Sequence, residues 1–337
     1  MAESNRRFLL RSRPAGRITD ETFELVAEPV PEIEDGQALV RTQWISLDPT
    51  NRAWIRETPT YLPPVAIGEV MRAAGLGQVV ASKHDRYREG QLVQGLLGWQ
   101  EWAVVSDAAP LLPVPDVPGV SPSAFLGVLG ATGLTAWIGV QEIGRPQPGE
   151  TFVVSAAAGA VGSVAGQIAK IRGARAVGIA GGERKCALLT DELGFDAAVD
   201  YRASDWRDAL VAATPDGIDV DFENVGGSIM EAIFARLNLR SRVVLCGLIS
   251  GYNDAELPPG PRSFGVLLTQ RVHLQGFIVL DHLDRIVEAA TEMGGWIREG
   301  KLKPIETVIE GFEQLPAAVN MLFDGANTGK LVLRVSD

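Results

Sequence analysis

The sequence predicts an α/β fold, with a doubly wound parallel sheet and a second, β-rich domain. Two observations predict it. From about residue 150, apolar β-prone runs recur about one βα unit apart, with helical patterns between them. Before about residue 125, short β-prone segments are separated by clusters of Pro, Gly and Asp, which is typical of a sheet with many turns. The length of 337 residues suits about two domains.

The strands of the parallel sheet are predicted from six apolar runs. These runs do not alternate with polar residues, which is typical of strands covered on both faces. Between the second and third runs, ERKCALLTDELG predicts a helix in which Cys186, Leu189 and Leu193 share a face and Gly194 is the C-cap. The predicted strands are residues 151–156, 175–180, 197–201, 218–223, 241–247 and 273–280.

The β-rich domain is predicted from segments at both ends of the chain. QALVRTQWISL, GLGQVVAS and QEWAVVS are expected to be strands, and GKLVLRV near the C-terminus a strand that returns to them. We therefore expect a domain of residues 1–125 that is completed by 304–337, and a nucleotide-binding domain of residues 126–303. The charged stretch SKHDRYREG, which contains His84, predicts an exposed loop.

The composition excludes several classes of function. A net charge of -11 and a pI near 4.9 argue against nucleic-acid binding, which requires a basic surface. With only two cysteines and no Cys/His cluster at zinc-ligand spacing, neither a disulfide framework nor a metal site is expected. We expect a cytoplasmic protein that no membrane anchors. The uncharged stretch 117–141 is long enough to span a bilayer, but its prolines and glycines favour a buried connection followed by a helix.

A nucleotide site is predicted at SAAAGAVGSVAGQIAK, residues 155–170. Read from Ala157, the pattern is A-x-G-x-x-G, placed between a predicted strand and a predicted helix as the dinucleotide fingerprint requires. Gly159 allows the backbone to approach a pyrophosphate, Gly162 allows close packing of helix on strand, and Ser163 adds a hydroxyl. The helix N-terminus attracts an anion. The alternative is a tight glycine turn without a ligand, and the strand–turn–helix context favours the nucleotide.

The next strand ends in VGIAGGERK, where the type of dinucleotide is decided. An NAD site usually has Asp or Glu at this point to bind the ribose 2′-hydroxyl, but this chain has Gly181. A carboxylate would repel a 2′-phosphate, whereas Arg184 and Lys185 attract one, and Tyr201 at the end of the third strand adds a hydroxyl. The alternative is that both cations are solvated surface charges. The missing acid favours an NADP site.

Several motifs occur together and in order. They are LDPTNR (47–52), PPVAIGEVM (63–71), GATGLTAW (130–137), AAAGAVGSVAGQIAK (156–170), GIAGGERK (178–185), ENVGG (223–227), CGLISGYN (246–253), QGF (275–277) and NTGK (327–330). As a set they resemble the zinc-independent medium-chain dehydrogenase/reductases, in the branch of the leukotriene/prostaglandin reductases and alkenal double-bond reductases. The resemblance covers residue 40 to the C-terminus.

This resemblance implies a GroES-like β domain, a Rossmann domain and a homodimer formed through the Rossmann domain. It implies an enzyme that uses NADPH to reduce the carbon–carbon double bond of α,β-unsaturated aldehydes and ketones without a metal. Lys185 and Tyr201 would hold the 2′-phosphate. Together with Gly159 and Gly181, the other residues expected at the cofactor are Ala160, Val161, Gly162, Ser163, Asn224, Cys246, Gly247, Leu248, Ile249, Ser250, Tyr252, Phe277, Ile278, Val279 and Asn327.

One position departs from the family pattern. Members of this family from eukaryotes carry a tyrosine a few residues before QGF, as a proton donor or enolate stabiliser, and this chain has Thr269 there. A threonine hydroxyl is a poor acid, so Tyr252, Tyr61 or a cofactor ribose hydroxyl would provide the donor that the carbonyl oxygen requires. Two other functions stay open: an NADPH:quinone oxidoreductase of the same superfamily, and a protein that binds NADPH without turnover.

Overall fold

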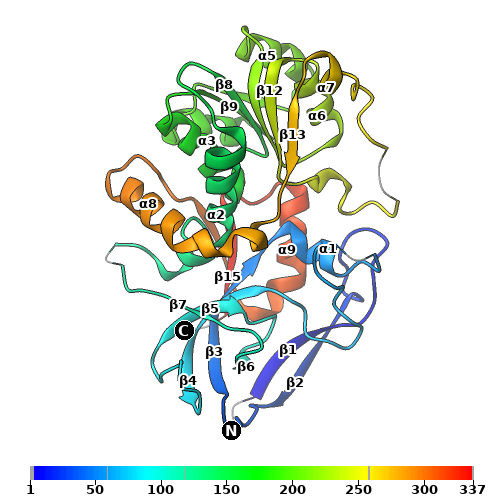
Figure 1. Cartoon of the computed structure of the whole chain (residues 1–337). Helices are drawn as coiled ribbons and strands as arrows, with labels where there is room; N and C mark the ends of the chain where they lie inside the picture. The colour runs from blue at the N-terminus through cyan, green and yellow to red at the C-terminus, as the bar shows by residue number, and fades with distance from the viewer. Residues whose placement is uncertain (1–3, 59, 118, 257–258, 336–337) are drawn as a thin grey trace. The chain divides into compact units, whose positions relative to one another are not determined.

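The chain folds into two compact units. An α/β unit spans Gly127–Glu306 and Asn327–Lys330, and a β-rich unit contains the other segments, up to Leu126, Thr307–Ala326 and from Leu331 onward. The computed structural model describes residues 4–58, 60–117, 119–256 and 259–335 (Figure 1). The outermost residues of the predicted β-rich domain, 1–3 and 336–337, lie outside the described residues.

The assignment of two short segments differs from the sequence-based one. Residues 304–306 and 327–330 group with the α/β unit, although the sequence placed them in the β-rich domain. Hydrogen bonds explain the difference. The Gly329 N–H donates to the carbonyl of Ala158 at 2.8 Å, and the Lys330 N–H donates to the carbonyl of Ile305 at 2.8 Å.

The α/β unit is built around a six-stranded parallel sheet, as predicted. Its order is β10-β9-β8-β11-β12-β13, which is the 3-2-1-4-5-6 order of the Rossmann fold when the strands are numbered along the chain. From β8 the next strands are added on one side of the sheet, and from β11 onward they are added on the other side. Ligands of such sheets bind at this switch point, outside the carboxyl ends of the strands. The strands are β8 (Thr151–Ser155), β9 (Arg175–Ala180), β10 (Ala197–Asp200), β11 (Ile218–Glu223), β12 (Leu237–Leu245) and β13 (His273–Gly276).

Helices cover both faces of this sheet, and α2 and α3 lie on the opposite side from α6 and α7 (Figure 1). On one face, Gly139 lies so close to the ring of Phe222 that a Cβ would be 2.4 Å from it. On the other face, Val153 and Val243 share a core with Ile233. The helices and helical turns are α2 (Ala131–Ile138), η2 (Gly139–Gly144), α3 (Ala160–Ile171), α4 (Glu183–Ala187), η3 (Leu188–Glu192), α5 (Trp206–Ala213), α6 (Gly227–Phe234), η4 (Ile249–Gly251), α7 (Val266–Thr269), η5 (Val279–Arg285) and α8 (Ile286–Arg298).

Two elements differ in detail from the sequence-based expectations. The helix predicted after β9 is a short α-helix, α4, that continues as the π-helical turn η3, and it ends before Gly194, whose φ is +72°. The last predicted strand stops at Gly276 because helical turns begin at Val279. A third segment, the uncharged stretch 117–141, contains the expected helix, which is α2. Within the described residues no helix has the length and apolar character that a membrane crossing requires.

The β-rich unit is dominated by a seven-stranded sheet. Its order is β14-β15-β3-β4-β5-β7, and β6 also pairs with β3. The C-terminal strand β15 pairs antiparallel with β3, as GKLVLRV predicted. The elements are β1 (Ser4–Leu10), β2 (Phe23–Pro29), β3 (Ala38–Leu47), α1 (Pro49–Trp54), β4 (Ala74–Ser82), β5 (Leu92–Leu96), β6 (Trp102–Val105), β7 (Leu112–Pro113), η1 (Pro122–Leu126), β14 (Glu306–Glu310), η6 (Phe312–Gln314), α9 (Leu315–Asp324) and β15 (Lys330–Arg334).

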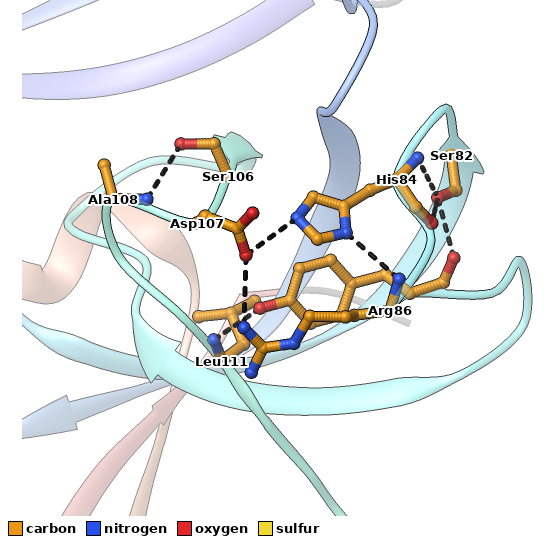
Figure 2. Close-up of polar contacts among 8 residues, drawn as sticks. Ser82, His84, Arg86, Ser106, Asp107, Ala108 and Leu111 are labelled. Atoms are coloured by element: carbon orange, nitrogen blue, oxygen red, sulfur yellow. Dashed lines mark hydrogen bonds and ion pairs between the residues drawn. The ribbon is translucent and has the colours of Figure 1, made fainter.

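The loop after β4 contains a buried histidine, although the sequence predicted an exposed loop. The side chain of His84 is only 4% exposed. Its Nδ1 accepts a hydrogen bond from the Arg86 N–H at 3.1 Å, and its Nε2 lies 3.4 Å from Asp107 Oδ1 (Figure 2). Tyr87 packs against its ring, with 4.6 Å between the ring centroids. The loop is therefore folded around His84, which the local charge pattern does not reveal.

Candidate cofactor site and active site

The predicted phosphate turn joins β8 to α3. Gly159 caps α3 with extended backbone, and its N–H closes a turn on the carbonyl of Ala156 at 2.9 Å. A Cβ on Gly162 would lie 2.5 Å from the same carbonyl oxygen, so only glycine fits there. The Ser163 N–H already donates to the Gly159 carbonyl at 3.0 Å. The N–H groups of the first helical turn that precede it are those that a helix start leaves for an anion.

Exposure separates the predicted residues of this turn. Gly159, Ala160 and Val161 are half-buried and accessible to a ligand, whereas Gly162 and Ser163 are buried. Ser163 is only 3% exposed, so its hydroxyl is a poor candidate for the contact with the pyrophosphate that the sequence suggested. The anion would therefore be bound mainly by backbone N–H groups and not by this side chain.

Asn327 belongs to a segment that lies beside the phosphate turn. The Gly329 N–H donates to Ala158, and Gly329 pairs with Gly159 as an isolated parallel bridge. Asn327 is 6% exposed, and its Nδ2 donates to the carbonyl of Gly329 at 3.0 Å. A Cβ on Gly329 would lie 2.0 Å from the Ile305 carbonyl oxygen, so this approach also requires glycine. The fold thus brings residues separated by more than 160 positions to one turn.

Cations gather around Gly181 at the end of β9. A Cβ on Gly181 would lie 2.9 Å from Nε of Arg202 and 2.9 Å from the ring of Tyr201, so both side chains lie over this glycine. Burial lowers the pKa of the Lys185 ammonium, and the positive charges of Arg202 and Arg184 lower it further. Lys185, Arg202 and Arg184 therefore lie close enough to repel one another. A dianionic 2′-phosphate would relieve this repulsion.

The turn that follows β9 is supported by a carboxylate. Asp200 Oδ1 accepts the N–H of Gly182 at 2.7 Å and the N–H of Arg202 at 2.9 Å. The acid near this site therefore bonds two backbone N–H groups of the surrounding turns.

The turns after β11 and β12 are joined by hydrogen bonds. The Ile249 N–H donates to the carbonyl of Asn224 at 3.1 Å, and Ser250 Oγ donates to the carbonyl of Val225 at 2.6 Å. Cys246 and Gly247 both donate their N–H groups to the carbonyl of Glu223. The structure therefore brings Asn224 together with the predicted segment from Cys246 to Tyr252.

Tyr252 folds back over its own turn. Its hydroxyl lies 3.4 Å from the Leu248 N–H and would lie 3.5 Å from a Cβ on Gly247. The hydroxyl accepts a hydrogen bond from this N–H, and burial raises the pKa of the Tyr252 phenol, so the group keeps its proton at neutral pH and can donate it to a ligand. Burial also raises the pKa of the neighbouring Cys246 thiol to about 12, which disfavours a nucleophilic thiolate there.

The remaining predicted residues are spread over other segments. Phe277, Ile278 and Val279 are half-buried after β13, and the Phe277 ring lies 6.3 Å from that of His282. Thr269 ends α7, is exposed, and places its hydroxyl 3.4 Å from the carbonyls of Gly265 and Val266. Tyr61 belongs to the β-rich unit, where it is 41% exposed and packs edge-on against Trp54.

Comparison with known proteins decides the family. A family model described as the N-terminal domain of oxidoreductases matches residues 6–114, and one described as zinc-binding dehydrogenase matches residues 160–293. The chain is 44% identical over 339 residues to the NADPH-dependent curcumin reductase of Escherichia coli (strain K12), with 99% of this chain and 98% of that protein covered. This chain is a medium-chain dehydrogenase/reductase. It belongs to the branch that the ordered motifs indicated.

Two further proteins support the cofactor of this reductase. The NADP(+)-dependent 2-alkenal reductase of Nicotiana tabacum is 35% identical over 344 residues, with 100% of this chain and 99% of that protein covered. The crystal structure of CurA from Vibrio vulnificus in complex with NADPH matches with a TM-score of 0.94 and 40% identity, covering 98% of this chain and 99% of that one. The reductase is an NADP-dependent oxidoreductase, and its cofactor is NADPH.

The residues present fit this cofactor. Gly162 has no Cβ that would fill the phosphate turn, and the cations around Gly181 follow the second strand, where NADP sites commonly have positive charge. Sequence reasoning missed Arg202, which follows Tyr201 directly and was detectable as a basic residue after the third strand. It also missed Ser155 and Glu223, for which no local signal exists because their contact joins residues 68 positions apart.

Proposed function

We propose that this reductase transfers hydride from NADPH to the β-carbon of α,β-unsaturated aldehydes and ketones, reducing their carbon–carbon double bond without a metal. The observation that carries the proposal is the cluster of cations around Gly181, taken together with relatives named for curcumin and 2-alkenal reduction. Lys185 and Tyr201, with Arg202 beside them, select NADPH. The other predicted cofactor residues, apart from the buried Ser163, bind and orient it from the turns around the phosphate site and from the segments after β11, β12 and β13.

The protein's part in the chemistry is to stabilise the charge that develops on the carbonyl oxygen. NADPH supplies the hydride. Tyr252 is the preferred donor among the protein's hydroxyls because it belongs to the turn after β12 and burial keeps it protonated. Tyr61 is the second candidate. Thr269 is not assigned this role, since its hydroxyl lies close to the carbonyls of its own helix and is a weak acid.

The mechanism needs no zinc. Zinc prefers thiolate and imidazole ligands, and burial raises the pKa of both cysteine thiols, Cys186 and Cys246. Among the described residues, no group of three or more His, Cys, Asp and Glu side chains is arranged to hold a metal ion. Turnover should therefore be unchanged after dialysis against EDTA. Loss of turnover with EDTA and its recovery with zinc would contradict this part of the proposal.

The experiment that tests the function is a screen of NADPH oxidation with enals, enones and quinones of graded size, with product analysis. Saturated aldehydes or ketones as products support the proposal. Turnover of quinones alone would make the protein an NADPH:quinone oxidoreductase. NADPH binding without oxidation by any acceptor would indicate a protein that senses or stores the cofactor.

We also propose a cytoplasmic homodimer, formed at the edge of the α/β sheet. β13 is one of the two edge strands, and all four of its residues are exposed, including Leu274 at 37%. An edge strand with an exposed leucine is suited to pairing with a second copy. Light scattering of the protein and of Leu274→Lys checks this, with a dimer expected for the first and a monomer for the second. A monomeric unmutated protein would contradict the assembly.

A further inference from the structure

Glu223 places a buried carboxyl group at the end of β11. The residue is 0% exposed. Its Oε1 accepts three hydrogen bonds: from the hydroxyl of Ser155 at 2.7 Å, from the Val225 N–H at 2.5 Å and from the Gly226 N–H at 2.9 Å. Val225 and Gly226 form the ENVGG turn, in which Gly226 has a φ of +80°. One oxygen atom thus holds the start of this turn and a residue of the adjacent strand.

Ser155 continues the connection toward the phosphate turn. It is the last residue of β8, is 0% exposed, and directly precedes the turn that begins at Ala156. Its Oγ accepts the Asn224 N–H at 2.8 Å while donating to Glu223. The Asn224 side chain completes the link, because its Nδ2 donates to the Ser155 carbonyl at 2.8 Å. The ends of β8 and β11 are therefore tied together through both side chains and backbone.

The backbone of Glu223 reaches a third turn. Its carbonyl oxygen accepts the Cys246 N–H at 2.9 Å and the Gly247 N–H at 3.0 Å, at the beginning of the turn after β12. Glu223 therefore contacts the segments that follow three neighbouring strands of the parallel sheet. These are the segments against which a dinucleotide lies in a sheet of this order.

A second buried carboxyl on the same strand has no such role. Asp221 is 0% exposed, and neither of its carboxyl oxygens has a hydrogen-bond partner among the described residues. Its neighbours in the sheet register are Val153 and Val243, which are apolar and buried. Asp221 is therefore buried like Glu223 but does not bond to the turns. It offers a matched control for the effect of burying a carboxyl group in this strand.

We propose that Glu223 is a positioning residue for the cofactor, and that with Ser155 it holds the turns after β8, β11 and β12 in the conformation that binds NADPH. The inference rests on the proposed cofactor site. Glu223 acts through Asn224, Val225 and Gly226 and does not touch the reacting atoms. Holding the turns in advance lowers the ordering cost of binding, so loss of Glu223 weakens NADPH binding more than it slows hydride transfer.

The direct test compares Glu223→Ala with Glu223→Gln by titrating NADPH against protein fluorescence, without any acceptor substrate. Alanine removes the acceptor of three donors, and we expect the Kd for NADPH to rise about tenfold or more. Glutamine keeps one carbonyl oxygen and has the shape of the protonated acid, so its Kd should stay within about threefold of the unmutated value. An unchanged Kd in Glu223→Ala overturns the proposal, as does an equal loss in both variants.

Two further variants keep the test decisive if Glu223→Ala does not fold. Ser155→Ala removes one arm of the connection, and we expect its Kd for NADPH to be several-fold higher than that of the unmutated protein. Asp221→Asn alters the matched buried carboxyl and should leave the Kd for NADPH unchanged. A loss of affinity in Asp221→Asn equal to that in Ser155→Ala would show a merely structural effect. Because NADPH binding is measured by itself, failure of the proposed enone reduction leaves this result readable.

Discussion

The turns that follow β8 and β11 are buried and fixed by hydrogen bonds, whereas most of the hydroxyl groups that we considered as proton donors are exposed. The turns are held by buried hydrogen bonds to Glu223, and in the turn after β8 a Cβ on Gly162 would lie only 2.5 Å from the Ala156 carbonyl oxygen. Tyr61 and Thr269 are exposed, and the hydrogen bonds of Thr269 go to carbonyls of its own helix. Tyr252 lies between these extremes, being half-buried within a cofactor turn.

This difference predicts that NADPH binding and the reduction of the substrate depend on different residues. If backbone groups of these turns orient NADPH, as we propose, then variation in the hydroxyl side chains near the substrate should leave cofactor binding intact. We therefore expect changes in the turns to alter cofactor affinity and changes in the hydroxyls to alter the rate at saturating cofactor.

The largest effect is expected for Tyr252→Phe. If its hydroxyl stabilises the charge on the carbonyl oxygen, kcat with an enone should fall about 100-fold or more, with the Kd for NADPH nearly unchanged. Stopped-flow measurement of NADPH oxidation, together with a binding titration, checks both quantities. Tyr61→Phe is the control. A kcat for Tyr252→Phe within about threefold of the unmutated enzyme would assign the role to Tyr61 or to a ribose hydroxyl.

The next effect is expected in the phosphate turn. In Gly162→Ala the new Cβ would meet the Ala156 carbonyl oxygen at 2.5 Å, so the turn must shift away from its binding conformation. We expect NADPH affinity to fall about 10- to 100-fold, measured by calorimetry. Gly294→Ala in α8 is the matched control, since no atom lies within 4 Å of its added Cβ. Retained affinity in Gly162→Ala would refute the assignment of this turn.

Lys185→Ala tests the seat of the 2′-phosphate. The variant should lose about 10- to 100-fold in NADPH affinity and little in NADH affinity, because only the former carries the phosphate. Arg184→Ala is the comparison: Arg184 is exposed, whereas Lys185 is half-buried among the cations. Equal affinities for NADPH and NADH in the unmutated protein would contradict the seat altogether.

The smallest effect concerns stability and not binding. Burial, followed by the charge of Glu223, raises the pKa of Asp221 above its unfolded value of about 4. The folded state therefore holds this proton more tightly, and the stability associated with it is complete below about pH 4 and lost as pH rises through the folded pKa. Asp221→Val should raise the free energy of unfolding by about 1–3 kcal/mol at pH 8, with a smaller gain at pH 5.

Urea denaturation at the two pH values checks this prediction. Asp208→Asn, which changes an exposed carboxylate of α5, serves as the control and should show no such trend. A gain in Asp221→Val that is independent of pH would mean that the carboxyl does not titrate in this range.

Much of the α/β unit was predictable because its signals are local. Strands covered on both faces are apolar throughout, and the six runs correspond to β8 through β13 with small differences at the ends. Gly159 and Gly162 could be assigned to a turn from their spacing and from the strand and helix around them. The break of the helix after β9 into α4 and η3 was not predictable, because its apolar pattern fits either geometry.

The sequence by itself indicated the family through an ordered set of motifs between residues 47 and 330, and it predicted the NADP type of the site from residues 178–185. It also predicted the alternation of strands and helices in the α/β unit, because each of these signals can be read from short segments of the chain. Only the tertiary structure decided which residues support that site. Arg202 lies over Gly181, Gly329 lies against Ala158, and Ser155 meets Glu223 only because the sheet aligns strand ends that are far apart in sequence. Such contacts depend on how the strands align in the sheet, and the spacing of residues along the chain does not reveal this alignment.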